Sequence, residues 1–284
     1  MKRPQLTPAR TSRSLAIGSM ALGLTAAGLV ATTPAQARPD ATSWSNQGIR
    51  SGIKGVDVSR WQHGNTHELN FSKLRTAGVQ FAIIQASNGY PRSDAIAAQW
   101  WAIDRPAAKR AGVVVGAYHF AYPTSKVPNI VADARGEARL AARRTSGFGR
   151  GHLATALDLE SAPNNLTKSQ LTRWATAWLN TYKRKSGRTP YLYSYTYFIE
   201  TRLNPSSSLT RYPLWLADYG RGQSKPESVR GWPRRKTKLW QFTSSGKLPG
   251  SGSRTIDLDV YLGSTKSFRK RAQLTKRGAR RYGL

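Results

Sequence analysis

Two carboxylates stand close together in the stretch Ala156-Leu157-Asp158-Leu159-Glu160, at the end of an otherwise apolar run. On a β-strand, side chains two residues apart point to the same face. Asp158 and Glu160 are therefore expected to face one way, while Leu157 and Leu159 face the other. Paired acids are the groups that cleave glycosidic bonds, one of them protonated as the proton donor. Salt bridges to some of the 45 Lys and Arg residues are the alternative reading of the pair.

The ends of other apolar runs carry acids and aromatic residues as well. Six of the 14 acids fall at such ends or within the last run, namely Asp57, Asp158, Glu160, Asp218, Asp257 and Asp259. Salt bridging alone would not favour these positions over others. Aromatic rings nearby could stack on sugar rings. The candidate substrate-binding residues are Tyr118, His119, Tyr193, Tyr195, Trp215, Asp218, Tyr219, Trp240 and Gln241. His119 lies between Tyr118 and Phe120, and a lone histidine in such a strand is more often a hydrogen-bonded core residue than a catalyst.

Alternating strands and helices would have to position these residues. The expected strands are 55–59, 80–87, 113–120, 153–160, 190–198, 213–219, 238–244 and 255–261. The expected helices are 70–78, 94–112, 128–147 and 167–187, with a short one after Tyr197. Near-continuous apolar strands separated by helices favour a parallel sheet covered by helices. We therefore predict an α/β fold, a TIM-like barrel of eight strands and about five helices, with no helices between the last strands. Catalytic residues of such barrels gather at the carboxyl ends of the strands.

The termini differ in composition from the predicted barrel, which spans 54–263. Residues 1–37 have a basic start, an apolar run and the small residues Ala35 and Ala37, which together predict a secretory signal peptide cleaved after Ala37. A membrane anchor is the alternative, but the run is short for a spanning helix, so no stable anchor is expected after cleavage. Residues 38–53 are interpreted as a linker. Residues 264–284 are interpreted as a basic, solvated tail that binds polyanions.

The charge of the chain is extreme, with a formal net value of +31. Such a field attracts polyanions, among them nucleic acid and the anionic polymers of a cell wall. For an exported protein the wall polymer is the expected partner, and no specific nucleic acid is expected. The chain has no cysteine, which excludes disulfides and thiolate metal sites. We expect a monomer that is secreted or associated with the cell wall.

The sequence lacks the residue patterns of two other classes of hydrolase, the zinc hydrolases and the serine esterases. Only four histidines occur, without the paired helical spacing of a zinc hydrolase, so no metal is expected. No Gly-x-Ser-x-Gly turn of a serine esterase is present.

Six segments together resemble the glycoside hydrolase family 25 lysozymes, which are muramidases. In order, they are GVDVSRWQ, AGVVVGAYHFAYP, ALDLE, YPLWLADYG, LWQFTSSG and IDLDVYLG. The resemblance implies a barrel of eight strands and five helices that hydrolyses the β-1,4 bond between N-acetylmuramic acid and N-acetylglucosamine in peptidoglycan, without a cofactor. It implies Glu160 as the proton donor and Asp158 as its partner, which either orients the substrate acetamido group or activates water. Asp57 and Asp257 match the other site carboxylates of the family.

Two positions depart from the family pattern. Ser87-Asn88-Gly89 stands where Thr-Glu-Gly is usual, and Asp259 stands where Asn is usual. The loss of an acid at Asn88 keeps open a non-catalytic barrel that binds the wall or another polyanion. A chitinase-like glycosidase also carries Asp-x-Glu on a barrel strand, but its further acids and glycines are missing before Asp158.

Overall fold

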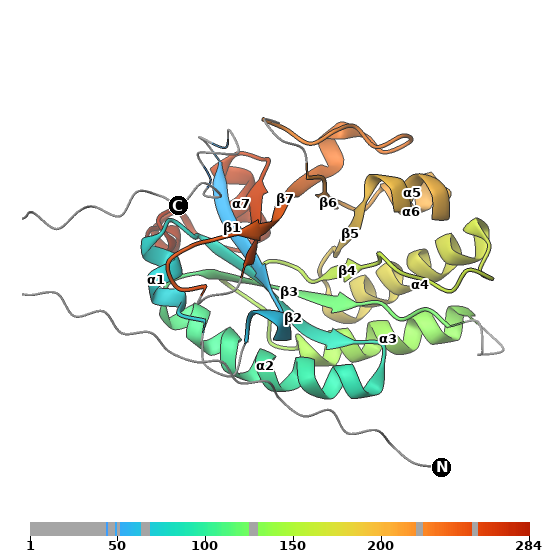
Figure 1. Cartoon of the computed structure of the whole chain (residues 1–284), viewed down its shortest axis with the longest axis horizontal. Helices are drawn as coiled ribbons and strands as arrows, with labels where there is room; N and C mark the ends of the chain where they lie inside the picture. The colour runs from blue at the N-terminus through green and yellow to red at the C-terminus, as the bar shows by residue number, and fades with distance from the viewer. Residues whose placement is uncertain are drawn as a thin grey trace, which may run out of the picture. The chain divides into compact units, whose positions relative to one another are not determined.

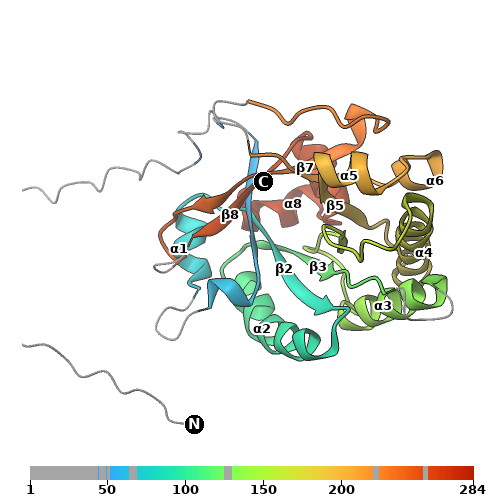
Figure 2. The ribbon, with the colours of Figure 1, turned by 45° about the vertical axis from the view of Figure 1, so that its right-hand side comes forward.

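Eight strands pair in sequence order and close into a barrel, as predicted (Figures 1 and 2). This computed structural model describes Trp44, Ile49 and residues 52–63, 69–124, 130–219, 224–251 and 255–284, all within one compact unit, Pro39–Leu284. The predicted signal peptide lies outside the described residues. The strands are β1 Ile53–Val58, β2 Phe81–Asn88, β3 Val114–Phe120, β4 Ala156–Asp158, β5 Tyr191–Tyr195, β6 Leu214–Ala217, β7 Thr237–Gly246 and β8 Ile256–Tyr261.

The barrel is not wholly parallel. Strands β1 to β7 run parallel, whereas β8 is antiparallel to both β7 and β1. The predicted parallel pairing is wrong for this strand. The stretch between β7 and β8 contains no helix among its described residues, so the chain returns as a hairpin. The start of β8 thus lies beside the end of β1, with Asp257 opposite Asp57.

Helices cover the first part of the barrel in the predicted order. They are α1 Phe71–Thr76, α2 Pro91–Arg110, α3 Ile130–Arg144, α4 Lys168–Ser186, α5 Thr196–Arg202 and α6 Ser207–Thr210. The chain also forms the 3-10 helices η1 Arg60–Gln62 and η2 Arg234–Lys236. No helix in the described part of the chain combines the length and apolar character needed to cross a membrane.

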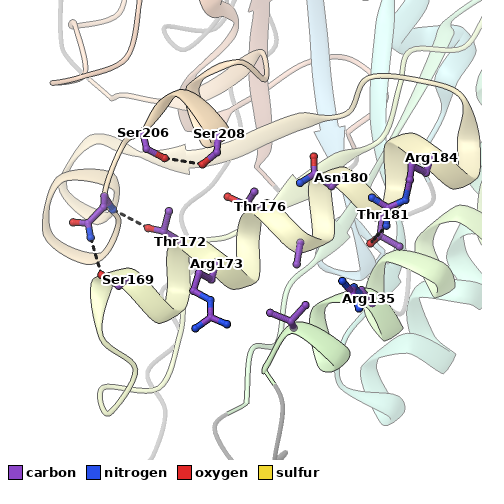
Figure 3. Close-up of a pocket in the computed structure, with 13 residues that line it drawn as sticks. Arg135, Ser169, Thr172, Arg173, Thr176, Asn180, Thr181, Arg184, Ser206 and Ser208 are labelled. Atoms are coloured by element: carbon purple, nitrogen blue, oxygen red, sulfur yellow. Dashed lines mark hydrogen bonds between the residues drawn. The ribbon is translucent and has the colours of Figure 1, made fainter.

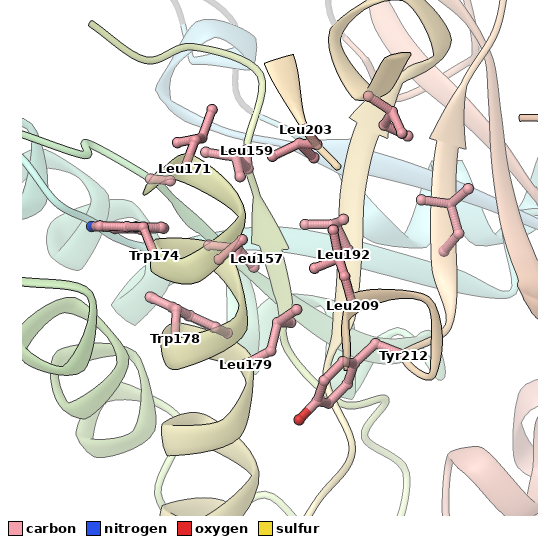
Figure 4. Packing of buried hydrophobic residues seen from close by; sticks show 14 of the residues in the cluster. Leu157, Leu159, Leu171, Trp174, Trp178, Leu179, Leu192, Leu203, Leu209 and Tyr212 are labelled. Atoms are coloured by element: carbon pink, nitrogen blue, oxygen red, sulfur yellow. The ribbon is translucent and has the colours of Figure 1, made fainter. Parts of the chain in front are cut away.

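Helix α4 shows how the local sequence fixes an element. Thr167 accepts a hydrogen bond from the Gln170 amide (3.2 Å), and the Gln170 side chain accepts from the Thr167 amide (2.9 Å), a capping box. Gly187 ends the helix with φ at 68°, a left-handed conformation that favours glycine. An apolar stripe then buries Leu171, Trp174 and Trp178 against the outward face of the sheet (Figure 4).

Strand alternation separates two kinds of core. Leu157 and Leu159 point outward and are buried in the cluster that includes α4 (Figure 4). Ala156 points into the barrel, where it belongs to an inner cluster with Tyr193 and Trp215. The lumen is therefore packed by side chains below the site.

The C-terminal segment is folded, and the prediction of a solvated tail is wrong. It forms α7 Thr265–Arg271, α8 Lys276–Ala279 and the 3-10 helix η3 Arg280–Tyr282. Phe268, Ala272 and Tyr282 are buried in the inner cluster of the barrel. Because β8 runs antiparallel, its end delivers the chain to the mouth opposite the carboxylates. The few apolar residues of this basic segment close that mouth.

Two residues of the predicted linker also belong to the core. Trp44 and Ile49 are buried in the cluster that contains β1 and β7 residues, and the Trp44 ring lies 5.8 Å from that of Phe242. The linker prediction is wrong for these two positions, and β1 begins at Ile53, one residue earlier than the predicted barrel.

Candidate active site

A cleft of about 510 Å³ opens at the carboxyl ends of the parallel strands. Its lining includes nine of the predicted residues: Asp57, Tyr118, Asp158, Glu160, Tyr193, Trp215, Tyr219, Gln241 and Asp257. Eight further residues complete the lining: Ser59, Arg60, Trp61, Gln62, Gln85, Asn88, Ser93 and Phe120. The cleft is thus walled by carboxylates, amides and aromatic rings.

The β4 pair lies as the strand alternation predicted. Asp158 is the last residue of β4 and is buried, and Glu160 lies just beyond the strand at the rim. Asp158 Oδ1 has no hydrogen-bond partner among the described residues. A buried carboxylate oxygen without a partner is costly. It is therefore available to a group brought by a ligand.

Burial shapes the protonation of this pair. Burial, and then the neighbouring Glu160 charge, raise the pKa of Asp158 well above its usual value. Burial likewise raises the pKa of Glu160. Two close carboxylates in a desolvated site cannot both ionise readily. The pair therefore keeps a proton at a higher pH than isolated carboxyls would, which is what an acid catalyst needs.

Strands β1 and β8 supply a second group of acids. Asp57 and Asp257 are paired across the two antiparallel strands, and Asp259 is paired with Gly55. Burial, followed by the charge of Asp259, raises the pKa of Asp57 well above its usual value. Burial and the charge of Asp57 raise the pKa of Asp257 to about 9. These acids therefore hold protons to a higher pH than free carboxyls do, and none of them is in an ion pair with a basic residue in the part of the chain that the structure describes.

Asp259 lies beneath the cleft and does not line it. It is fully buried, and its Oδ1 accepts a hydrogen bond from Trp215 Nε1 at 2.7 Å. Burial raises its pKa to about 8. The acid that replaces the usual Asn thus holds a ring of the cleft wall.

Gln241 links three strands across the floor of the cleft. Its Nε2 donates to Asp57 Oδ2 at 2.7 Å, and its Oε1 accepts from the Tyr193 hydroxyl at 2.8 Å and from the Tyr219 hydroxyl. The two hydroxyl donors fix the orientation of the amide, because its oxygen must face them. Its nitrogen is then held towards Asp57.

The turn after β1 contributes residues that the sequence interpretation missed. Ser59 and Gln62 form a capping box around η1, with the Ser59 amide donating to Gln62 Oε1 at 2.8 Å. This turn presents Trp61, which is 64% exposed, beside the cleft with the Arg60 guanidinium 4.2 Å from its ring. The Ser-x-x-Gln spacing was the signal that could have located this turn.

His119 is not in the cleft, so its prediction as a substrate-binding residue is wrong. Tyr118 faces the lumen, and alternation turns His119 to the outer side of the sheet. There its Nε2 lies 2.8 Å from Glu137 Oε2 and its Nδ1 2.8 Å from Ser87 Oγ. It is a fully buried core histidine that joins β3 to α3.

Three other predicted residues do not line the cleft. Trp240 points outward into the cluster that also contains Trp44 and Ile49, since strand alternation turns it away from Gln241. Asp218 follows β6 and its Oδ2 accepts from the Glu227 amide at 2.8 Å, holding the segment before β7. Tyr195 lies at the end of β5 with its ring 5.8 Å from that of Phe198 in α5.

Asn88 lines the cleft and also shapes the turn after β2. The Asn88 side-chain Oδ1 accepts a hydrogen bond from the Tyr90 backbone amide at 2.8 Å, and the Asn88 backbone amide donates to Asp94 Oδ1 at 3.0 Å. Asn88 therefore stabilises the turn after β2, because its neutral side chain accepts a hydrogen bond from the backbone of that turn.

The sequence matches a known protein family over most of its length. The family described as Glycosyl hydrolases family 25 matches residues 56–251, more than half of the chain. The chain belongs to glycoside hydrolase family 25.

Some relatives of this family-25 enzyme carry lysozyme or muramidase names. Lysozyme M1 of Streptomyces globisporus is 28% identical over 222 residues, 75% of this chain and 69% of that protein. The N,O-diacetylmuramidase of Chalaropsis is 27% identical over 212 residues, 71% of this chain and 92% of that protein. The crystal structure of the bacterial lysozyme from Streptomyces coelicolor superposes with a TM-score of 0.68 at 26% identity, covering 80% of this chain and all of that one. The chain is thus a glycoside hydrolase with the barrel of family 25.

The family match ends before β8, which carries Asp257 and Asp259. Both acids reach the site through the pairing of β8 with β1. Among the described residues, no group of three or more His, Asp or Glu is arranged to hold a metal ion.

Proposed function

We propose that this family-25 hydrolase is a muramidase that cleaves the β-1,4 bond between N-acetylmuramic acid and N-acetylglucosamine in peptidoglycan. The observation that carries the proposal is the pair Asp158 and Glu160 at the rim of a cleft walled by Tyr118, Tyr193 and Trp215. Lysozyme and muramidase names among the relatives support the same substrate.

Glu160 is the proposed proton donor. Burial raises the pKa of Glu160 above its usual value, so it keeps its proton to a higher pH than a free glutamate and can give it to the glycosidic oxygen as the bond breaks. Water then adds to the sugar carbon, and the proton it releases restores Glu160. Asp158 either holds the substrate acetamido group for internal attack or activates the water, and its unpartnered oxygen suits both tasks.

Asp57, Asp257 and Gln241 are proposed to position the sugar beside this pair. The Gln241 amide restrains Asp57, and Asp257 lines the cleft next to it. Tyr219 and Trp61, each more than half exposed, offer ring faces to flanking sugars.

Secretion completes the proposed function. Residues 1–37 have the composition of a signal peptide, and the strong positive charge of the rest of the chain would concentrate the monomeric enzyme on anionic wall polymers.

The test is product analysis of purified peptidoglycan digested by the wild type and by Glu160→Gln. The wild type should create new reducing ends on muramic acid, and Glu160→Gln should lose at least about 10²-fold in rate, the usual contribution of an acid catalyst. Glu227→Gln, an exposed acid outside the cleft, is the matched control and should cleave as the wild type does. Binding of peptidoglycan without cleavage would support the non-catalytic alternative. Preferential cleavage of chitin oligosaccharides would support the chitinase-like one.

A further inference from the structure

A second concave surface runs along the outside of the barrel between α3 and α4. One cavity of about 450 Å³ is lined from α3, α4 and the chain around α6, and another of about 350 Å³ lies between α3 and the end of α4. We call their combined surface the α3–α4 groove. It shares no lining residue with the catalytic cleft.

The groove carries six basic side chains and no acid: Arg135, Arg139, Arg143, Arg173, Arg184 and Lys185. None of them is in an ion pair among those formed by the described residues. Three of them, Arg135, Arg139 and Arg143, repeat every four residues on α3. Like charges at this spacing repel and destabilise a helix. The three arginines therefore do not stabilise helix α3 itself.

The acids of α3 do not relieve this repulsion, because both turn inward. Asp133 Oδ2 accepts from Trp174 Nε1 at 2.8 Å, and Glu137 Oε2 lies 2.8 Å from His119 Nε2. Helix α4 has no acid in its sequence. The groove thus presents positive charge that the fold leaves uncompensated.

Most of the remaining lining consists of hydroxyl and amide groups, with Val131, Ala142 and Ala177 as the apolar exceptions. Figure 3 shows Ser169, Thr172, Thr176 and Asn180 along α4, with Arg135 on the α3 side. Ser206 and Ser208 lie across the groove. Thr172 Oγ1 accepts a hydrogen bond from the Asn204 amide and Thr181 Oγ1 accepts one from Arg184, whereas Thr176 Oγ1 has no partner among the described residues.

We propose that the α3–α4 groove binds a linear polymer of polyol units joined by phosphodiesters. Guanidinium groups bind phosphate oxygens in a bidentate manner, and the hydroxyl and amide side chains match hydroxylated units between phosphates. No aromatic residue is among the lining residues of either cavity. A groove for single-stranded nucleic acid would need rings on which bases stack. The groove would hold the enzyme on a phosphate-rich surface while the cleft stays free.

The test is the affinity of the full chain for soluble poly(glycerol phosphate), measured by titration calorimetry across a range of salt concentrations. The groove variant is Arg135→Gln/Arg173→Gln/Arg184→Gln. The matched control is Lys270→Gln/Lys276→Gln/Arg277→Gln, which removes the same charge from the C-terminal segment. The groove variant should bind at least about tenfold more weakly, and its plot of log affinity against log salt should be shallower by roughly two. The control should stay within about twofold of the wild type.

Equal losses in the two variants would overturn the proposal, because net charge alone would then explain binding. Tighter, groove-dependent binding of an oligothymidylate with the same number of phosphates would overturn the polymer class. Cleavage of a soluble, uncharged glycan should be the same in all three proteins, which separates this proposal from the proposed catalysis. The single change Arg173→Gln, with an expected loss of about threefold, keeps the test valid if the triple variant folds poorly.

Discussion

Gln241 and Asp57 are joined by a 2.7 Å hydrogen bond across 184 positions of sequence. The bond ties β7 to β1 over the floor of the barrel, and two tyrosine hydroxyls fix the amide that makes it. One neutral side chain thus orders an acid of the cleft and two of its aromatic walls.

Replacing this amide should therefore affect both stability and activity. Gln241→Leu leaves Asp57 without its amide donor and both tyrosines without their acceptor. We expect the free energy of unfolding to fall by about 1–3 kcal/mol and kcat/KM to fall with it. Urea denaturation and peptidoglycan cleavage measure the two effects. Gln99→Leu, on the exposed face of α2, should change neither; an unperturbed Gln241→Leu would contradict the network.

Asp158→Asn should separate stability from catalysis. Asp158 is buried and one of its oxygens is unpartnered, so removing its charge should leave the protein as stable as the wild type or more so. Cleavage should fall by about 10²- to 10⁴-fold, because either proposed task of Asp158 needs its charge. Thermal unfolding and reducing-end assays on the same preparation test both parts. A destabilised variant that retains cleavage would show that Asp158 has a structural role only.

Stability should fall as the pH rises. The pKa values of Asp259 and Asp257 are raised to about 8 and about 9, whereas unfolded aspartate has a pKa of about 3.9. Between these values the folded state holds protons that the unfolded chain has released. The free energy of unfolding therefore declines from about pH 4 towards pH 8 to 9, by up to about 1.4 kcal/mol per pH unit for each such group.

Asp259→Asn should make this decline less steep by up to one proton, since Asn can still accept the hydrogen bond from Trp215. Urea denaturation at intervals from about pH 5 to pH 9 measures the slope. Glu227→Gln is the exposed control and should keep the wild-type slope. A slope for Asp259→Asn equal to that of the wild type would show that Asp259 is ionised in the folded state across this range.

Helix α7 of the C-terminal segment should unfold together with the rest of the barrel. Phe268 is fully buried against Phe81 and Tyr261. Phe268→Ala should lower the free energy of unfolding by about 3–5 kcal/mol, the usual loss for a buried phenylalanine. Lys266→Ala, exposed on the same helix, should have little effect. A small loss for both would restore the interpretation of a solvated tail.

The sequence by itself determined the local features. Period-two alternation placed Asp158 in the lumen and Leu157 outside, and the capping box and Gly187 bounded α4, because these depend on residues close in the chain. The order of strands and helices was likewise enough to predict the barrel. The same alternation could have excluded His119 and Trp240, whose neighbours Tyr118 and Gln241 already occupied the inner face.

Only the tertiary structure decided the features that depend on distant pairing. The antiparallel course of β8 puts Asp257 beside Asp57, whereas a parallel strand would start at the opposite mouth. The same reversal sends the C-terminal segment to that opposite mouth, where Phe268 and Tyr282 become core despite the many charges around them. Strand direction is set by hydrogen bonds between segments far apart in sequence, and no local pattern of residues records it.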